Sequence, residues 1–140
     1  MASRRRARSI ALQALYEVDT TTHRAEEVLA RHVYDDSVGE DAFDFISAMV
    51  QGVLEHRHQL DMVIQRHAPA FPVQQMAAID RNILRMALFE LKYCNNVPFK
   101  VSINEAVELA KSFGSDASPR LVNGVLGAVV DEETGREKGS

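Results

Sequence analysis

The chain has 140 residues and a mass of 15.6 kDa, and 46% of its residues are hydrophobic. This length suits one compact domain or two small ones and excludes a large multidomain enzyme, while the composition excludes global disorder. The net charge of −4 is uneven, because residues 1–16 hold four Arg and no acid whereas the remainder holds 12 Lys and Arg against 20 Asp and Glu. A cationic end on an acidic body favours contact with a polyanion.

Three helices are predicted in the first half of the chain, because apolar residues recur there at steps of three and four. The first covers residues 4–18 and is interrupted by the threonines at 20–22, and the second covers 25–34. After a loop over 35–39, a third covers 40–57. The apolar residues at 60, 63 and 64 either extend this helix or begin a fourth.

The second half is also predicted to be helical. Prolines at 69 and 72 indicate a connector over 68–73, followed by a central, largely buried helix over 74–94. Ser102 followed by Glu105 predicts a capping box at the start of a helix over 102–113, which ends at Gly114. The last helix starts near Ser118, with Pro119 in its first turn.

No segment shows the alternation typical of strands, so the predicted fold class is all-α. We expect a single domain over residues 1–130 and a flexible polar tail over 131–140, because the tail lacks an apolar anchor. The cationic start does not lead into a secretory signal, and the lone Cys94 has no partner for a disulfide. No apolar run approaches the roughly 20 residues that cross a bilayer. We therefore expect a cytoplasmic protein that does not enter a membrane.

Catalysis and metal binding need side chains that converge, and few candidates do so. His56, His58 and His67 are the best metal candidates, but the first two point about 200° apart on a helix. No glycine-rich phosphate loop follows a strand. We therefore predict no enzyme, no metal site and no cofactor. Gly124 and Gly127 are expected either at a crowded helix crossing or against the backbone of a partner.

The remaining candidates are cationic or aromatic. The dense cluster at positions 4, 5, 6 and 8 contains no acid, which is typical of phosphate binding. Tyr16 either stacks on an unpaired base or is a half-buried core residue. Arg81 and Arg85 lie one turn apart, with Lys92 further along the same helix. They either touch phosphate or an acidic protein surface, or pair with nearby carboxylates.

Three segments carry a family resemblance. Arg4-Arg5-Arg6-Ala7-Arg8 runs into Ala14-Leu15-Tyr16; IDRNILR over 79–85 is followed by FEL over 89–91; VPFKVSINEAVELAKSFG over 97–114 is followed by LVNGVLG over 121–127. Together these segments resemble the NusB family of transcription antitermination factors. The resemblance covers nearly the whole chain except residues 20–40 and the tail.

The resemblance implies about six to seven helices in two small bundles packed across one another, without enzymatic activity. Members of this family bind the single-stranded boxA element of nascent transcripts together with NusE, a small-subunit ribosomal protein. They act in an antitermination complex with RNA polymerase that reads through terminators, notably in ribosomal RNA operons.

Transferred to matching positions, the resemblance implies an RNA surface and a partner surface. The RNA surface would comprise Arg4, Arg5, Arg6, Arg8, Tyr16, Arg81, Arg85, Lys100, Phe113 and Ser118. The NusE surface would adjoin the helices around 80–126, with Asp80, Phe89 and Glu105. Many relatives have an aromatic residue before Val-Asn-Gly, where this chain has Leu121. A leucine offers no ring for base stacking, so the RNA contacts of the loop over 116–121 are expected to differ.

One alternative is a protein-interaction adaptor without intrinsic RNA binding, whose basic end serves solubility or docks on an acidic partner. The oligomeric state also stays open. The apolar helix around residues 45–54 could form a homodimer interface that masks the basic surface.

Overall fold

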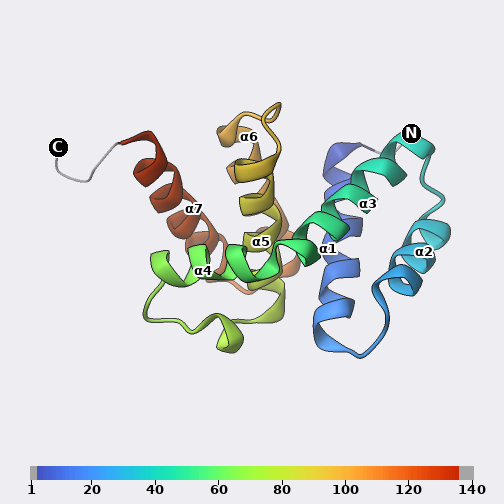
Figure 1. Ribbon diagram of the computed structural model, residues 1–140, viewed down its shortest axis with the longest axis horizontal. Coiled ribbons are helices and arrows are strands. Elements are labelled where there is room, and N and C mark those ends of the chain that lie inside the picture. The colour runs from blue at the N-terminus through green and yellow to red at the C-terminus, as the bar shows by residue number, and fades with distance from the viewer. Residues whose placement is uncertain (1–2, 136–140) are drawn as a thin grey trace. The chain divides into compact units, whose positions relative to one another are not determined.

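The structure is a computed structural model that describes residues 3–135, with only the backbone at 35 and 36. Within this range the chain forms seven α-helices, one 3-10 helix and no strand, which confirms the all-α prediction. The helices belong to two compact units that divide after Glu55 (Figure 1). None of the described helices has both the length and the apolar character needed to cross a membrane.

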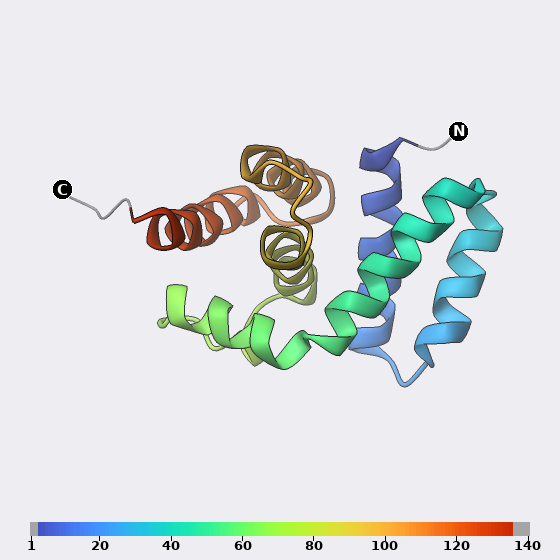
Figure 2. The ribbon, with the colours of Figure 1, turned by 45° about the horizontal axis from the view of Figure 1, so that its top comes forward.

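The first unit contains α1 (Arg4–Thr20), α2 (Ala25–Asp36) and α3 (Glu40–Glu55). Helix α1 begins after Ser3, whose Oγ accepts a hydrogen bond from the Arg6 N–H at 3.1 Å. Both other helices pack against α1, as Figure 2 shows. The core between them consists of fully buried side chains, among them Leu12, Leu15, Val28, Ile46 and Val50. The periodicity predicted all three helices to within a few residues.

The second unit contains α4 (Arg57–His67), the 3-10 helix η1 (Val73–Gln75), α5 (Ala78–Tyr93), α6 (Phe99–Phe113) and α7 (Ser118–Thr134). Helices α5, α6 and α7 pack on one another, and α4 contacts α5 and α7. Its core includes Leu60, Ile64, Leu84, Leu88 and Leu126. The apolar residues at 60, 63 and 64 therefore belong to a separate fourth helix.

Two helix boundaries differ from the prediction. Helix α5 begins at Ala78 rather than 74, because η1 ends in extended backbone at Met76 and Ala77. Helix α7 continues to Thr134, where the hydroxyl donates to the Val130 carbonyl at 2.8 Å and Gly135 closes the helix in the left-handed conformation. Residues 131–134 of the expected tail are thus helical, and 136–140 lie outside the described residues.

The predicted capping box is wrong. Helix α6 begins at Phe99, after Pro98, so Ser102 lies inside its first turn with its backbone N–H bonded to the Pro98 carbonyl. The Ser102 hydroxyl is buried and donates instead to Oε1 of Glu90 on α5 at 2.7 Å. Leaving a buried carboxylate without a hydrogen-bond donor costs free energy, whereas the backbone N–H of Ser102 is already bonded within the helix. The serine hydroxyl therefore bonds Glu90 instead of capping the helix.

Of the two alternatives for Gly124 and Gly127, the crowded helix crossing is wrong, because a Cβ at either position would meet open space among the described residues, and contact with a partner backbone stays a prediction. The close contact lies at Gly114 instead. A Cβ there would overlap the Ser118 side chain and approach the Ala110 carbonyl oxygen to 2.9 Å. Gly114 therefore allows the tight turn from α6 into α7.

Candidate nucleic-acid interface

The four arginines at the start of α1 fall into two pairs. Arg5 and Arg6 are exposed, whereas Arg4 and Arg8, one turn apart, both contact the Phe45 ring of α3. At 100° per residue, Arg5 and Arg6 lie on the helix face that also carries Ser9, Gln13 and Tyr16. We call these five residues the α1 polar face.

The α1 polar face is well suited to an RNA strand. Ser9 and Gln13 each use a side chain to bond a carbonyl one turn earlier, at 3.2 Å, which keeps them along the helix surface. Tyr16 is 41% exposed, which leaves part of its ring accessible, and base stacking by this ring stays a prediction. Two arginines and one exposed ring on one helix combine phosphate binding with a surface on which a base can stack.

The second pair of arginines is held by α3. The Arg4 guanidinium carbon lies 4.4 Å from the Phe45 ring centroid and that of Arg8 lies 5.4 Å from it, both within cation–π range. Arg4 also pairs with Asp41, with Nη1 and Oδ2 separated by 3.5 Å. Arg8 is only 7% exposed. Local patterns do not predict this arrangement, because the arginines and Phe45 are about 40 residues apart in the chain.

The predicted cationic stripe on α5 is engaged within the protein. Arg85 is buried and forms a two-pronged ion pair with Asp61 of α4, at 2.7 Å from Nε to Oδ1 and 2.9 Å from Nη2 to Oδ2. Arg81 donates to the Gln74 carbonyl at 3.0 Å, and Lys92 pairs with Glu133 at 2.6 Å. The structure thus favours pairing with carboxylates for Arg85 and Lys92, and RNA contacts by Arg81 and Arg85 stay predictions.

The α6–α7 region holds the other three predicted RNA residues. Lys100 is exposed in the first turn of α6, and Phe113, at its last residue, is 37% exposed. Ser118 is buried, and its Oγ accepts the Ser115 N–H at 2.9 Å, so it closes the turn. Arg120 is exposed in the first turn of α7 and has no ion pair among the described residues; sequence reasoning had not assigned it a role.

The three predicted partner residues do not share one environment. Asp80 is buried in the first turn of α5, and its Oδ1 has no hydrogen-bond partner within residues 3–135. Phe89 is half-buried, with its ring centroid 5.4 Å from that of Tyr93 and 6.2 Å from that of His56. Glu105 is half-buried on α6. Their role in binding NusE stays a prediction.

The three histidines considered as metal ligands do not converge. His56 stacks on Tyr93 with ring centroids 4.1 Å apart, and His58 is exposed. His67 donates from Nδ1 to the Val63 carbonyl at 2.9 Å. No group of three potential metal ligands occurs in the part of the chain that the structure describes.

The C-terminal end of α1 carries a charged cluster that the sequence did not reveal. Glu17 accepts hydrogen bonds from Arg31 at 3.0 Å and lies 2.6 Å from His23 Nδ1 and 3.1 Å from His32 Nε2. Chiefly the Arg31 hydrogen bonds, and then that of His23, lower the pKa of Glu17 from 4.5 to about 2. The carboxylate therefore ties α2 to the end of α1.

Known proteins are similar to this chain in sequence and in fold. The model of the NusB family matches residues 5–131. The transcription antitermination protein NusB of Dehalococcoides mccartyi (strain CBDB1) is 51% identical over 127 residues, which cover 91% of this chain and 89% of that protein. The structure matches T. maritima NusB with a TM-score of 0.87 at 29% identity, covering 94% of this chain and 92% of the other.

A further match is to a NusB crystallised with NusE and double-stranded RNA. The TM-score is 0.84 at 24% identity, covering 92% of this chain and 96% of the other, which is a likeness of fold. The sequence match shows family membership as well as fold, because half of the aligned residues are identical over most of both chains. The chain therefore belongs to the NusB family, whose relatives compared above are transcription antitermination proteins.

Proposed function

We propose that this chain binds the single-stranded boxA element of nascent transcripts together with NusE and promotes read-through of terminators, notably in ribosomal RNA operons. Membership of the NusB family supports this role, and a protein of the same fold has been crystallised with NusE and RNA. The role needs no catalytic step or cofactor, and it places the protein in the cytoplasm with RNA polymerase.

The observation that carries the proposal is the α1 polar face. Cations at a helix N-terminus oppose the helix dipole and cost about 0.3–1 kcal/mol each. The first turn of α1 nevertheless contains Arg4, Arg5 and Arg6 and no acidic residue. Arg5 and Arg6 are exposed on the α1 polar face, and a planar fork of N–H donors fits the oxygens of a phosphate.

An unpaired strand fits this surface better than a duplex. The exposed ring of Tyr16 lies on the same helix face as Arg5, and 11 residues separate them, or about 16 Å along the axis. A ring can stack only on a base that has left its own stack, as in single-stranded RNA. The exposed Lys100, Phe113 and Arg120 of α6 and α7 would offer a second set of phosphate and stacking contacts.

Salt-dependent binding of a boxA-like RNA, measured by fluorescence anisotropy with and without NusE, tests the proposal. Replacing Arg5 and Arg6 by Gln should reduce the slope of log K against log salt by about 0.7 for each lost phosphate contact. The melting temperature of the same double variant is measured beside it, so that a loss of binding is not mistaken for a loss of folding. Arg24→Gln is the matched control, since Arg24 is exposed at the N-cap of α2 and pairs, among the described residues, only with the nearby Glu26 at 3.2 Å.

The same measurements distinguish an RNA-binding factor from a protein-interaction adaptor without intrinsic RNA binding. If NusE binds equally well with and without RNA, and RNA binds neither the chain nor the complex, the chain is a protein-interaction module. If the slope is unchanged in the double variant, Arg5 and Arg6 do not contact phosphate.

A further inference from the structure

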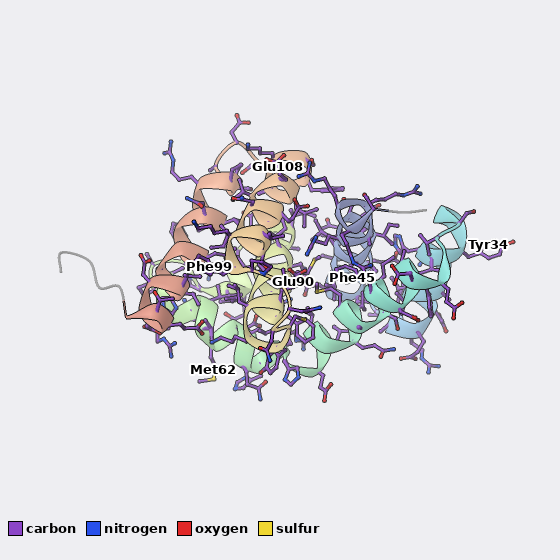
Figure 3. The ribbon with its side chains drawn as sticks, turned by 90° about the horizontal axis from the view of Figure 1, so that it is seen from above. Tyr34, Phe45, Met62, Glu90, Phe99 and Glu108 are labelled. Atoms are coloured by element: carbon purple, nitrogen blue, oxygen red, sulfur yellow. The ribbon has the colours of Figure 1, made fainter. Side chains whose placement is uncertain are left out.

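Helix α3 faces the start of α1 with two residues one turn apart, Asp41 and Phe45, and α1 presents Arg4 and Arg8 with the same spacing. Residues four apart lie on one face of a helix, so each pair meets the other across the α1–α3 contact. Figure 3 shows Phe45 on the side of α3 that lies against α1. These four residues have no place in the α1 polar face.

Arg4 has donors to spare in this arrangement. The guanidinium carbon of Arg4 lies 4.4 Å from the Phe45 ring centroid. The ring therefore fixes the position of the guanidinium without occupying the N–H donors of Arg4. Asp41 takes up one nitrogen, at 3.5 Å from Nη1. An arginine has five N–H donors in a planar fork, which suits two oxygens of one phosphate.

Asp41 is a weak and displaceable partner. The side chains of Arg4 and Asp41 are 49% and 81% exposed, and exposed pairs of this kind contribute less than about a fivefold preference. Water competes for both charges, and added salt screens them. A phosphate that binds through two oxygens can therefore replace the carboxylate.

We propose that Arg4, Phe45 and Asp41 form a second phosphate seat of the RNA surface, in which the Phe45 ring positions Arg4 and an RNA phosphate displaces Asp41. Phe45 is a positioning residue that does not touch RNA, and Asp41 competes with RNA for Arg4. Arg8, buried beside the same ring, helps to fix it. The seat rests on the proposed function, since RNA is its ligand.

Four variants measured with the same boxA-like RNA and NusE test this seat. Phe45→Leu keeps an apolar side chain without the ring and should weaken binding about two- to fivefold, whereas Phe45→Trp should retain it. Arg4→Gln should lower the salt slope by about 0.7. In the Arg4→Gln background, Phe45→Leu should have almost no further effect, because the residue that it positions is gone.

Asp41→Asn tests the competition and carries little risk to folding, since Asp41 is exposed. It should tighten binding by up to about fivefold at 50 mM salt, and the gain should shrink at 200 mM. Asp44→Asn is the matched control, because Asp44 is exposed on the same helix and removes the same charge without touching Arg4. A gain limited to Asp41→Asn supports the seat.

Three results would overturn the seat: wild-type affinity in Phe45→Leu, an equal loss from Phe45→Leu with and without Arg4, or equal gains from the two Asp variants. If any of these results is found while the Arg5 and Arg6 double variant still shows a reduced slope of log K against log salt, the seat is wrong and the proposed function stands. If the wild-type chain and its NusE complex bind no RNA, the proposed function fails and the seat falls with it.

Discussion

The ion pair between Asp61 and Arg85 is expected to hold α4 to α5, and Asp61→Ala tests this. The Arg85 side chain is 7% exposed, so its charge is nearly out of water, whereas Asp61 is 28% exposed. Removing one partner of a buried pair costs about 3–5 kcal/mol, because the other charge loses its counter-charge. The Asn82 side-chain oxygen, 3.3 Å from Arg85 Nη1, still accepts a hydrogen bond, and water reaches the partly exposed position 61, so we expect a cost of about 2–4 kcal/mol.

Urea unfolding followed by far-UV circular dichroism measures this cost. The midpoint should fall with the slope unchanged, and the melting temperature should fall by roughly 3 °C per kcal/mol. Asp44→Ala is the control, because it removes an exposed acid and should change stability by less than about 0.5 kcal/mol. Combining Asp61→Leu with Arg85→Met removes both charges and should recover most of the loss.

The same variants decide what Arg85 does. If Asp61→Ala is within about 0.5 kcal/mol of wild type, or the double variant is no more stable than the single one, the pair does not hold the helices. RNA affinity of Asp61→Ala, measured well below its melting temperature, should equal that of wild type. A changed salt slope with unchanged stability would instead show that Arg85 faces RNA.

Three more predictions concern stability. Gly114→Ala should lower the free energy of unfolding by about 1–3 kcal/mol in urea titration, because the new Cβ overlaps Ser118; an unchanged midpoint would contradict this. Ser102→Ala should cost about 1.5–3 kcal/mol, since the buried Glu90 carboxylate loses a donor, and Ser102→Cys should recover little of it. The pKa of Glu17 in the folded chain, about 2, is lower than its ordinary value, so its stabilising effect is complete above about pH 4.5 and is lost as the pH falls towards 2. Melting temperatures should accordingly differ between wild type and Glu17→Gln at pH 6 and converge near pH 2; a constant difference would refute the assignment.

Local sequence patterns predicted the helices well because their causes are local. The apolar steps that define α1 and the prolines that end α4 act within one or two turns. Contacts between helices have no such signal. Glu90 and Ser102 are 12 residues apart and Asp61 and Arg85 are 24 apart, so neither bond could be read from spacing. Ser102 and Glu105 matched a capping box locally, but the need of the buried Glu90 for a donor decided the outcome.

The candidate site shows the same limit for charge. Counting arginines located the cationic helix correctly, yet the count does not say what each guanidinium does. Arg8 and Arg85 are buried, Arg4 rests on a ring of α3, and Arg5 and Arg6 lie on the α1 polar face. These differences follow from which side chain of another helix lies opposite each arginine.

Two measurements, the free energy of unfolding and the salt slope of RNA binding, should therefore distinguish the roles of these arginines. Loss of Arg85 should reduce the free energy of unfolding because its partner is Asp61, and a reduced salt slope beside it would support the RNA contact that the resemblance implies. Loss of Arg5 or Arg6 should reduce the salt slope, because each exposed arginine that neutralises a phosphate releases counterions from the RNA. Arg4 should affect the slope only while Phe45 holds it. A single loss of RNA affinity is ambiguous among these causes, whereas stability and salt slope together assign each arginine to packing, to positioning or to RNA.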